Sequence, residues 1–243
     1  RSLPEEKVWR IKMVKKRNAE SHGLITHEQP KSPVAEAYRI LRTNLGFTGM
    51  DNPCRLIMVS SPNPQDGKST VIANLAVVMA QAGNKVMVVD CDLRKPAQHS
   101  IFKVDNNRGF TNCLVQKLEV AKAAHHDIVE NLTLLTSGPI PPNPAELLES
   151  ETTRSLWPQL LQEYDFVLID SPPVMAVTDA SILAAQADGA ILVVKAGETR
   201  IDLAKEARNQ LVNAGANLLG VVLNQLKVKR DDYQYYYYYA HEC

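Results

Sequence analysis

The chain has 243 residues, and its 27 basic side chains balance its 27 acidic ones, so the formal net charge is zero. Hydrophobic residues make up 45% of the chain and charged residues 22%, which is ordinary for a globular protein with a sizeable core. The balanced charge excludes a general electrostatic attraction to nucleic acid. The four cysteines lie far apart and fit neither a disulfide framework nor a zinc site. No apolar run approaches the roughly 18 residues of a membrane helix, so we expect a soluble protein of a reducing compartment.

The amino-terminal part of the chain is polar, and we expect residues 1–31 to form an irregular tail. Position 1 is not methionine, whereas Met13 precedes a basic cluster and would serve as a natural start, so residues 1–12 are interpreted as a foreign extension. Ser32 followed by Pro33 then predicts a helix, because a cap residue and a proline suit the first turn. An apolar stripe at helical spacing follows at Val34, Tyr38, Leu41 and Leu45.

Short apolar runs alternate with helical patterns over the rest of the chain. The runs predict strands at Arg55–Val59, Lys85–Val89, Leu132–Leu135, Phe166–Ile169, Ala190–Val194 and Leu218–Leu223. Helices are predicted at Lys68–Ala82, Pro144–Ser150, Thr152–Tyr164, Asp179–Ala187 and Asp202–Ala214. Because the strand runs are continuously apolar, both faces of the sheet should be buried, which indicates an α/β fold with a mostly parallel sheet and helices on both faces. We expect one such domain over residues 32–226.

The strongest motif lies between the strand at 55–59 and the helix that follows it. The loop there ends in Gly67-Lys68-Ser69, which is typical of a phosphate-binding P-loop when a buried strand precedes it and a helix follows. Backbone N–H groups would cradle phosphates, the lysine would reach the β/γ oxygens and the hydroxyl would ligate Mg²⁺. The strict pattern has a further glycine where this chain carries Pro62, and an accidental Gly-Lys-Ser is the alternative, which the strand–loop–helix context disfavours. The predicted nucleotide-binding residues here are Asp66, Gly67, Lys68, Ser69 and Thr70.

Two further motifs place carboxylates at the ends of predicted strands. Asp90 and Asp92 follow one apolar strand, and Asp170 ends another. The carboxyl ends of parallel strands face the crevice in which such folds bind ligands. A single terminal aspartate can be a mere turn former. Three acids beside a phosphate-binding loop are better explained by a metal ion and a proton acceptor, which phosphoryl transfer requires.

Six of the eight tyrosines fall within the last eleven residues of the chain. The run has neither helical periodicity nor strand alternation, so residues 227–243 are interpreted as an exposed, low-complexity tail. The clustered tyrosines are Tyr233, Tyr235, Tyr236, Tyr237, Tyr238 and Tyr239.

Together, the P-loop, the Asp90-x-Asp92-x-Arg94 motif, the strand ending in Asp170 and the tyrosine tail resemble the bacterial tyrosine kinases of capsule and exopolysaccharide synthesis. The resemblance is to the standalone cytoplasmic form of Gram-positive bacteria, and it covers most of the chain. It implies a P-loop NTPase fold and a non-specific protein-tyrosine kinase that uses ATP and Mg²⁺. It further implies autophosphorylation of the tyrosine tail in trans and regulation of capsular or exopolysaccharide synthesis.

The resemblance also implies a role for each matching residue. Lys68 would contact the transferred phosphate, and Ser69 would ligate Mg²⁺. Asp92 and Asp170 would hold the metal, largely through its waters. Asp90 would be the base for the incoming tyrosine hydroxyl, whose pKa near about 10 makes a positioned carboxylate useful.

The partners implied by the resemblance are a homo-oligomer, an adaptor and a phosphatase. Glu36, Arg39 and Arg42, with the tyrosine tail, would form the contact between subunits of a ring. From spacing alone these side chains are better explained as an intrahelical pair on a solvated face, whereas the resemblance favours the interface. A transmembrane adaptor would activate the kinase and hold it at the inner face of the cell membrane, and a cognate tyrosine phosphatase would act on it.

Several alternatives stay open. Asn224 ends a predicted strand at the crevice edge, where it could contact the adenine base or serve only as a turn residue. Gln65 stands where the family commonly has glycine, so a positive φ there would strain the loop. An ATPase switch of the partitioning or cell-division-positioning class shares the fold, but it usually carries lysine at the position of Pro62 and has no need of a tyrosine tail. A non-catalytic nucleotide-binding scaffold is the other alternative, and only Gln65 favours it.

Overall fold

The computed structural model describes residues 8–10, 23–48 and 54–226. Its strands are β1 (Val8–Arg10), β2 (Leu56–Ser60), β3 (Val86–Asp90), β4 (His125–Val129), β5 (Leu132–Leu135), β6 (Phe166–Asp170), β7 (Gly189–Lys195) and β8 (Leu218–Asn224). Its helices are α1 (Ile25–Glu28), α2 (Pro33–Thr48), α3 (Lys68–Ala80), α4 (Gln98–Phe102), α5 (Phe110–Gln116), α6 (Val120–Ala123), α7 (Pro144–Glu149), α8 (Glu151–Glu163), α9 (Asp179–Ala184) and α10 (Ile201–Asn213).

All the strands join one sheet in the order β1-β8-β7-β2-β6-β3-β5-β4. Every neighbouring pair is parallel except β4 with β5, which is antiparallel. In β2 and β3 each residue is buried, because helices cover both faces. The predicted α/β fold with a mostly parallel sheet is therefore confirmed.

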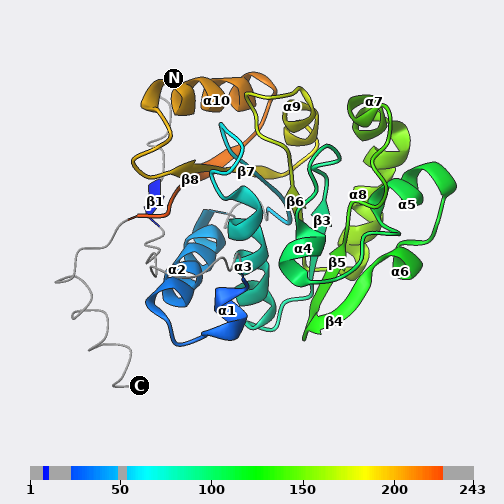
Figure 1. Ribbon diagram of the computed structural model, residues 1–243, viewed down its shortest axis with the longest axis horizontal. Coiled ribbons are helices and arrows are strands. Elements are labelled where there is room, and N and C mark those ends of the chain that lie inside the picture. The colour runs from blue at the N-terminus through cyan, green and yellow to red at the C-terminus, as the bar shows by residue number, and fades with distance from the viewer. Residues whose placement is uncertain (1–7, 11–22, 49–53, 227–243) are drawn as a thin grey trace.

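The two faces of the sheet carry separate hydrophobic clusters. Successive residues of β2 alternate between them: Ile57 and Val59 pack into the cluster under α2 and α3, whereas Leu56 and Met58 pack into the other. The second cluster lies under α8, α9 and α10, which Figure 1 shows on the side of the sheet opposite α2 and α3. Side chains of a strand point alternately to the two faces of its sheet. A strand that is buried on both faces therefore needs apolar residues at every position.

The order of the strands decides where the site can form. β2, β6 and β3 are adjacent and parallel at the centre of the sheet, so their carboxyl ends meet at one edge. In this register Asp170 lies opposite Val59 in β2 and opposite Asp90 in β3. The P-loop that leaves β2 and the two motif aspartates are therefore neighbours in space.

The amino-terminal segment differs from the predicted tail. β1 pairs in parallel with β8, and Trp9 is only 7% exposed. In α1, the buried Thr26 donates from its backbone N and from its hydroxyl to Asn74 Oδ1 in α3, at 3.0 and 2.9 Å. The expectation that residues 1–31 lie outside the domain is thus wrong at these two elements. Segments of three or four residues have no measurable periodicity, and only their tertiary partners bury them.

The other predicted elements occur within two or three residues of their expected ends, and the short elements α4, α5, α6 and β4 were not predicted. Each of these four is seven residues long or less, too short for a periodic pattern to emerge. None of the helices described is both long and apolar enough to cross a bilayer. The tyrosine tail, residues 227–243, lies outside the described residues.

Docking of β1 can be tested at its buried side chain. Trp9→Ala should lower the free energy of unfolding by about 3 kcal/mol, because truncating a buried tryptophan leaves a cavity against β8. Trp9→Phe, which keeps an aromatic ring in place, is the control and should cost less. The measurement is urea denaturation followed by circular dichroism, and an unchanged midpoint for Trp9→Ala would show that β1 contributes nothing to the domain.

Candidate active site

The P-loop connects the end of β2 to the first residue of α3. Gly67, the cap of α3, has φ +95°, and a Cβ placed there would lie 2.2 Å from Asn224 Nδ2. Glycine is required at this position for both its conformation and its close contact. The first N–H groups of α3 have no partners within the helix, so this end of the helix is suited to bind an anion. Ser69 and Thr70, in the first turn, are half-buried.

Asp66 shapes the loop from within. Its side chain accepts hydrogen bonds from the backbone N of Asn63 at 3.0 Å and from Thr199 Oγ1 at 2.8 Å. Burial raises the pKa of its carboxyl above the ordinary value, against the opposing effect of these two bonds. Both side-chain oxygens of Asp66 thus hold the loop in place, and its predicted contact with the nucleotide, which in a P-loop comes from the backbone N–H, stays a prediction.

Asn224 is fully buried at the end of β8. Its Nδ2 donates to the backbone O of Asp66 at 2.9 Å, and its Oδ1 accepts from the backbone N of Gln225 at 2.9 Å. Asn224 thereby fixes the carboxyl end of β8 against the P-loop. The second hydrogen of Nδ2 and the second lone pair of Oδ1 are not used by these two bonds, so the predicted adenine contact stays a prediction.

The motif carboxylates gather around one ammonium group. Lys68 Nζ lies 2.9 Å from Asp92 Oδ2 and 3.5 Å from Asp170 Oδ1, and it donates to Ser69 Oγ at 3.2 Å. Asp90 and Asp170 are fully buried, and Asp92 is 3% exposed. The structure thus brings together the residues for which the sequence predicts phosphate, metal and proton-accepting roles.

Asp90 is held by the backbone that follows it. Its Oδ2 accepts from the backbone N of Ala97 at 3.0 Å and of Gln98 at 2.9 Å, and its Oδ1 accepts from that of Asp92 at 3.2 Å. Burial first, and the charge of Asp170 second, raise the pKa of Asp90 to about 8. A carboxyl group with such a pKa can exchange a proton near neutral pH.

Burial and charge act in opposite directions on Lys68. Burial by itself would lower its pKa, but the carboxylates of Asp170 and Asp92 outweigh that effect and raise the pKa above its ordinary value. Lys68 is therefore charged. For Asp170, burial dominates and raises the pKa of the carboxyl. The site is a buried ion cluster whose charges depend on one another.

Two residues of the site carried no prediction of their role. Gln98 opens α4 and donates from Nε2 to Asp170 Oδ2 at 2.7 Å. Arg94 forms a bidentate pair with the buried Asp179 at the start of α9, at 2.9 and 3.0 Å. Arg94 was part of a recognised motif, whereas a glutamine in an irregular segment has no spacing signal by which sequence reasoning could find it. Cys91, between the two motif aspartates, is fully buried.

The chemistry of the donors fits a hard divalent ion held jointly with a nucleotide. Among the described residues, no three or more His, Cys, Asp or Glu side chains are grouped as a metal cage. Mg²⁺ is usually held by one or two carboxylates together with substrate phosphates and waters, so it needs no such cage. Asp92, Asp170 and the hydroxyl of Ser69, which surround the ammonium of Lys68, supply that kind of ligand set.

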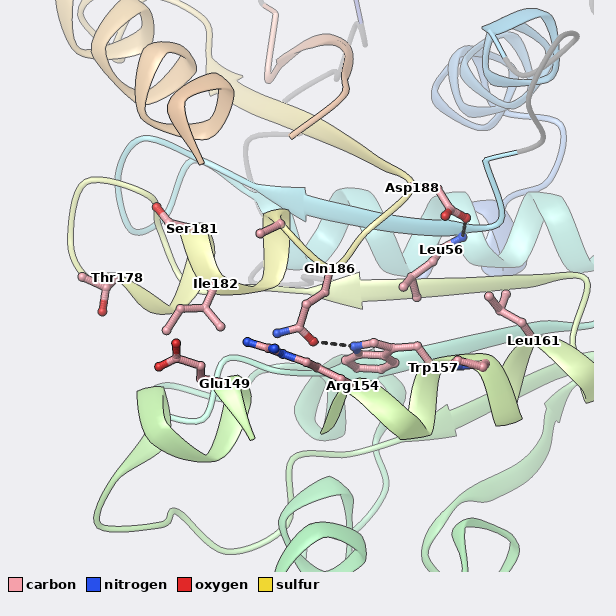
Figure 2. A pocket seen from close by; sticks show the side chains of 12 residues that line it. Leu56, Glu149, Arg154, Trp157, Leu161, Thr178, Ser181, Ile182, Gln186 and Asp188 are labelled. Atoms are coloured by element: carbon pink, nitrogen blue, oxygen red, sulfur yellow. Dashed lines mark hydrogen bonds between the residues drawn. The ribbon is translucent and has the colours of Figure 1, made fainter. Parts of the chain in front are cut away.

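A separate cavity of about 800 Å³ lies between α8 and α9, and it contains none of the predicted site residues. Figure 2 shows the side chains of Trp157 and Gln186 pointing toward one another in its lining, where Trp157 Nε1 donates to Gln186 Oε1 at 2.8 Å. Gln186 Nε2 also donates to the backbone O of Leu148 at 3.0 Å. The amide of Gln186 therefore joins three elements of the core far from the P-loop.

Residues 55–226 match the AAA domain family. With the parallel sheet and the P-loop, this match defines the class of protein, an α/β P-loop nucleotide-binding domain, for which ATP is the implied nucleotide.

Three relatives then narrow the class. The tyrosine-protein kinase YwqD of Bacillus subtilis (strain 168) is 43% identical over 88% of this chain and 91% of that protein. The putative tyrosine-protein kinase CapB of Staphylococcus aureus is 39% identical over 93% of this chain and 99% of that protein. The crystal structure of the chimerical protein CapA2B2 has a TM-score of 0.85 and 41% identity, covering 92% of this chain and 96% of that one. The chain belongs to the bacterial tyrosine kinases.

Proteins of the ATPase-switch class share the fold, but a solved member of that class matches a smaller part of this chain than the kinases do. The septum site-determining protein MinD from Pyrococcus horikoshii OT3, solved with Mg-ADP, has a TM-score of 0.62 and 26% identity over 75% of this chain. The common P-loop domain explains this similarity, and the kinases match this chain more fully and at higher identity.

A substitution at Gln65 tests whether the P-loop is strained at that position. Its φ is +67°, a region that costs a residue with a side chain about 1 kcal/mol or more. Gln65→Gly should therefore raise the free energy of unfolding by roughly 0.5 kcal/mol, since part of the relief is offset by the greater freedom of glycine in the unfolded chain. Gln81, at φ −60°, is the matched control, and Gln81→Gly should destabilise. Equal destabilisation by both changes in chemical denaturation would contradict strain at Gln65.

Lys68→Met should change stability as well as phosphoryl transfer. The structure buries this lysine among carboxylates, so its loss affects the fold as well as the chemistry. Removing one partner of a buried ion pair costs about 3 kcal/mol at neutral pH. The exposed Lys85, changed to methionine, is the control and should stay within about 0.5 kcal/mol of the parent.

The cost of Lys68→Met should shrink as the pH falls. The pKa values of Asp90 and Asp170 are raised in the folded state, so protonation of these carboxyls favours the folded state and is lost as pH rises toward about 8. A protonated carboxyl is neutral, so it loses no ion-pair partner when Lys68 is replaced. Urea titrations without nucleotide at about pH 5 and about pH 8 measure the effect, and a deficit that grows on acidification would contradict the assigned charges.

Proposed function

We propose that this tyrosine kinase is Mg-ATP-dependent and phosphorylates the tyrosines of its own tail in trans, between subunits of an oligomer. The observation that carries the proposal is the buried cluster of Lys68 with Asp90, Asp92 and Asp170 at the amino end of α3. Phosphoryl transfer needs a cation for the β/γ charge, ligands for a metal and an acceptor for the hydroxyl proton. The cluster contains a residue suited to each task.

The nucleotide phosphates would lie against the first turn of α3. Its free N–H groups and the ammonium of Lys68 would bind the β/γ oxygens, and Gly67 allows the backbone to approach closely. Asp92, Asp170 and Ser69 would hold Mg²⁺, which supplies further neutralisation of phosphate charge when bound. The rigid loop, tied through Asp66, would keep these donors in place.

Asp90 is suited to accept the proton of the incoming tyrosine. As the tyrosine oxygen forms its bond to the γ-phosphorus and the bond to ADP breaks, the hydroxyl proton would pass to the Asp90 carboxylate. Three backbone N–H groups fix the orientation of Asp90, and its pKa of about 8 makes the ionised carboxylate a stronger base than an ordinary aspartate, so transfer would increase with pH as Asp90 loses its own proton. An asparagine at this position would turn an N–H group toward a backbone donor, so Asp90→Asn also carries a cost in stability.

The acceptors would be Tyr233 and the run Tyr235–Tyr239. These residues follow β8, whose last residue Asn224 contacts the P-loop. We propose that the tail extends from this edge of the domain into the nucleotide site of a neighbouring subunit in a ring.

The contact between subunits is proposed to involve α2. Within the chain, Arg39 Nη1 donates to Glu36 Oε2 at 2.8 Å, and Arg42 Nη1 donates to the backbone O of Val78 at 2.8 Å. The first bond is the expected intrahelical pair, whereas the second ties Arg42 of α2 to α3. The same helix exposes Ile40 at 50% and Phe47 at 62%, and such apolar side chains support an interface on this helix.

Partners and location follow the family. The solved relative CapA2B2 is a chimerical protein, and the fusion supports an activating partner for this chain. We place that partner in the membrane, with the kinase in the cytoplasm at the inner face, regulating capsular or exopolysaccharide synthesis and opposed by a tyrosine phosphatase. The relative named CapB supports the link to capsule.

Transfer in trans can be tested by mixing two variants. One carries Lys68→Met and an intact tail, and serves only as acceptor. The other has an intact site but phenylalanine at all six tail tyrosines, and serves only as donor. With labelled ATP and Mg²⁺, the mixture should give phosphotyrosine on the Lys68→Met chain, whereas each variant alone should give at most a few per cent of the parent signal.

Each other outcome selects a different function. Phosphotyrosine in the parent but none in the mixture would mean transfer within one chain. Phosphate release without phosphotyrosine would favour an ATPase switch, and nucleotide binding without either product would favour a scaffold. Variants are compared only after circular dichroism confirms that both are folded, because Lys68→Met carries a cost in stability.

A further inference from the structure

Gln98 links all three motifs of the site, although its side chain belongs to none of them. It is the first residue of α4 and is fully buried. Its backbone N donates to Asp90 Oδ2 at 2.9 Å. Its side-chain Nε2 donates to Asp170 Oδ2 at 2.7 Å and to the backbone O of Ser69 at 3.0 Å. One residue therefore joins the end of β3, the end of β6 and the first turn of α3.

The contact with Asp170 sets the direction of its carboxylate. Oδ2 of Asp170 is taken by Gln98, and Oδ1 lies 3.5 Å from Lys68 Nζ. A buried carboxylate keeps one orientation when each oxygen has a different partner. Without the amide, the Oδ2 atom would lose the shorter of these two contacts, and the carboxylate could turn away from the P-loop.

The orientation of the Gln98 amide is itself fixed. Both partners of Nε2, a carboxylate and a carbonyl oxygen, can only accept, so the NH₂ group must face them. The carbonyl oxygen Oε1 is buried and has no hydrogen-bond partner among the described residues. An unpartnered buried carbonyl is costly, and it is left ready to accept a hydrogen bond from a water or ligand that enters the site.

We propose that Gln98 is a positioning residue for the metal–nucleotide complex: it holds Asp170 and the first turn of α3 in the arrangement that binds Mg²⁺ together with the phosphates. This rests on the proposed Mg-ATP dependence. Residues that orient the ligands of a metal commonly change metal affinity by 10-fold to 100-fold when they are removed. Gln98 would act through Asp170 and Ser69, and its Oε1 would accept from a water of the metal.

The test compares nucleotide affinity with and without the metal. Gln98→Met keeps the length of the side chain but removes the amide, and Gln98→Asn keeps the amide but shortens its reach. Gln186→Met is the matched control, because it removes an amide with two bonds of 2.8 and 3.0 Å at a remote place. Each protein is titrated with a fluorescent ADP analogue in Mg²⁺ and in EDTA, and its thermal midpoint is measured.

In the parent, Mg²⁺ should tighten binding of the analogue. Gln98→Met should weaken binding in Mg²⁺ by about tenfold or more and change it by less than about threefold in EDTA. Gln98→Asn should show the same selective loss with a smaller drop in thermal midpoint. Gln186→Met should lose thermal stability and keep the full effect of Mg²⁺.

The failures are distinguishable. Parent binding that is indifferent to Mg²⁺ would overturn the proposed metal dependence and the inference with it. Parent binding that needs Mg²⁺, with a folded Gln98 variant that keeps the full effect, would overturn the role of Gln98 alone. Equal loss in Mg²⁺ and in EDTA would assign Gln98 to the fold of the P-loop and not to the metal. Should Gln98→Met fail to fold, Gln98→Asn decides between these outcomes.

Discussion

The rest of the site depends on one buried ammonium group. Asp90, Asp92 and Asp170 lie at the carboxyl ends of neighbouring strands, where almost no water reaches them. Carboxylates so placed repel one another, and burial disfavours their charge. Lys68 lies between Asp92 and Asp170 and offsets both effects, while the raised pKa of Asp90 lowers the remaining negative charge. A buried charge that has lost its partner is strongly destabilising, so the cluster constrains the fold as well as the chemistry.

The surrounding backbone is arranged to keep this cluster in place. Asp90 is held by the N–H groups that begin α4, and Gln98 from the same turn reaches Asp170. On the other side, Asp66 ties the P-loop to Thr199 after β7, and Asn224 closes the end of β8 against it. Five strands of the sheet therefore contribute to one site. The contacts of Gln98 with Asp170, of Thr199 with Asp66 and of Asn224 with Asp66 join residues far apart in the sequence, and each depends on the order in which the strands pair.

The same ammonium group links the resting site to the proposed reaction. Lys68 cannot donate fully to the carboxylates and to the nucleotide phosphates at the same time, because its ammonium group has only three hydrogens. Under the proposed chemistry, a divalent cation on Asp92 and Asp170 would take over their neutralisation and leave Lys68 for the phosphates. The geometry of the loop, with Gly67 in a left-handed conformation, allows the phosphates to approach without moving the helix.

Sequence by itself determined the fold class and the principal chemical groups. Continuous apolar runs require burial on both faces, which gives the parallel sheet, and a Gly-Lys-Ser ending before a helix has few other uses. It also indicated strain at Gln65, which stands where the family commonly has glycine. The φ of Gln65 is indeed +67°. These signals are local, so a short stretch of residues contains all of each.

Tertiary structure alone decided the rest. β1 and α1 have too few residues to show a pattern, and they are elements only because β8 and Asn74 bind them. The bond from Asn224 to the P-loop became known only when the structure placed β8 beside that loop. Lys68 proved buried, and Gln98 became visible as a link between motifs that lie far apart in the chain. The physical reason is the same in each case: hydrogen-bond partners and burial are set by strand order, which no local pattern of residues specifies.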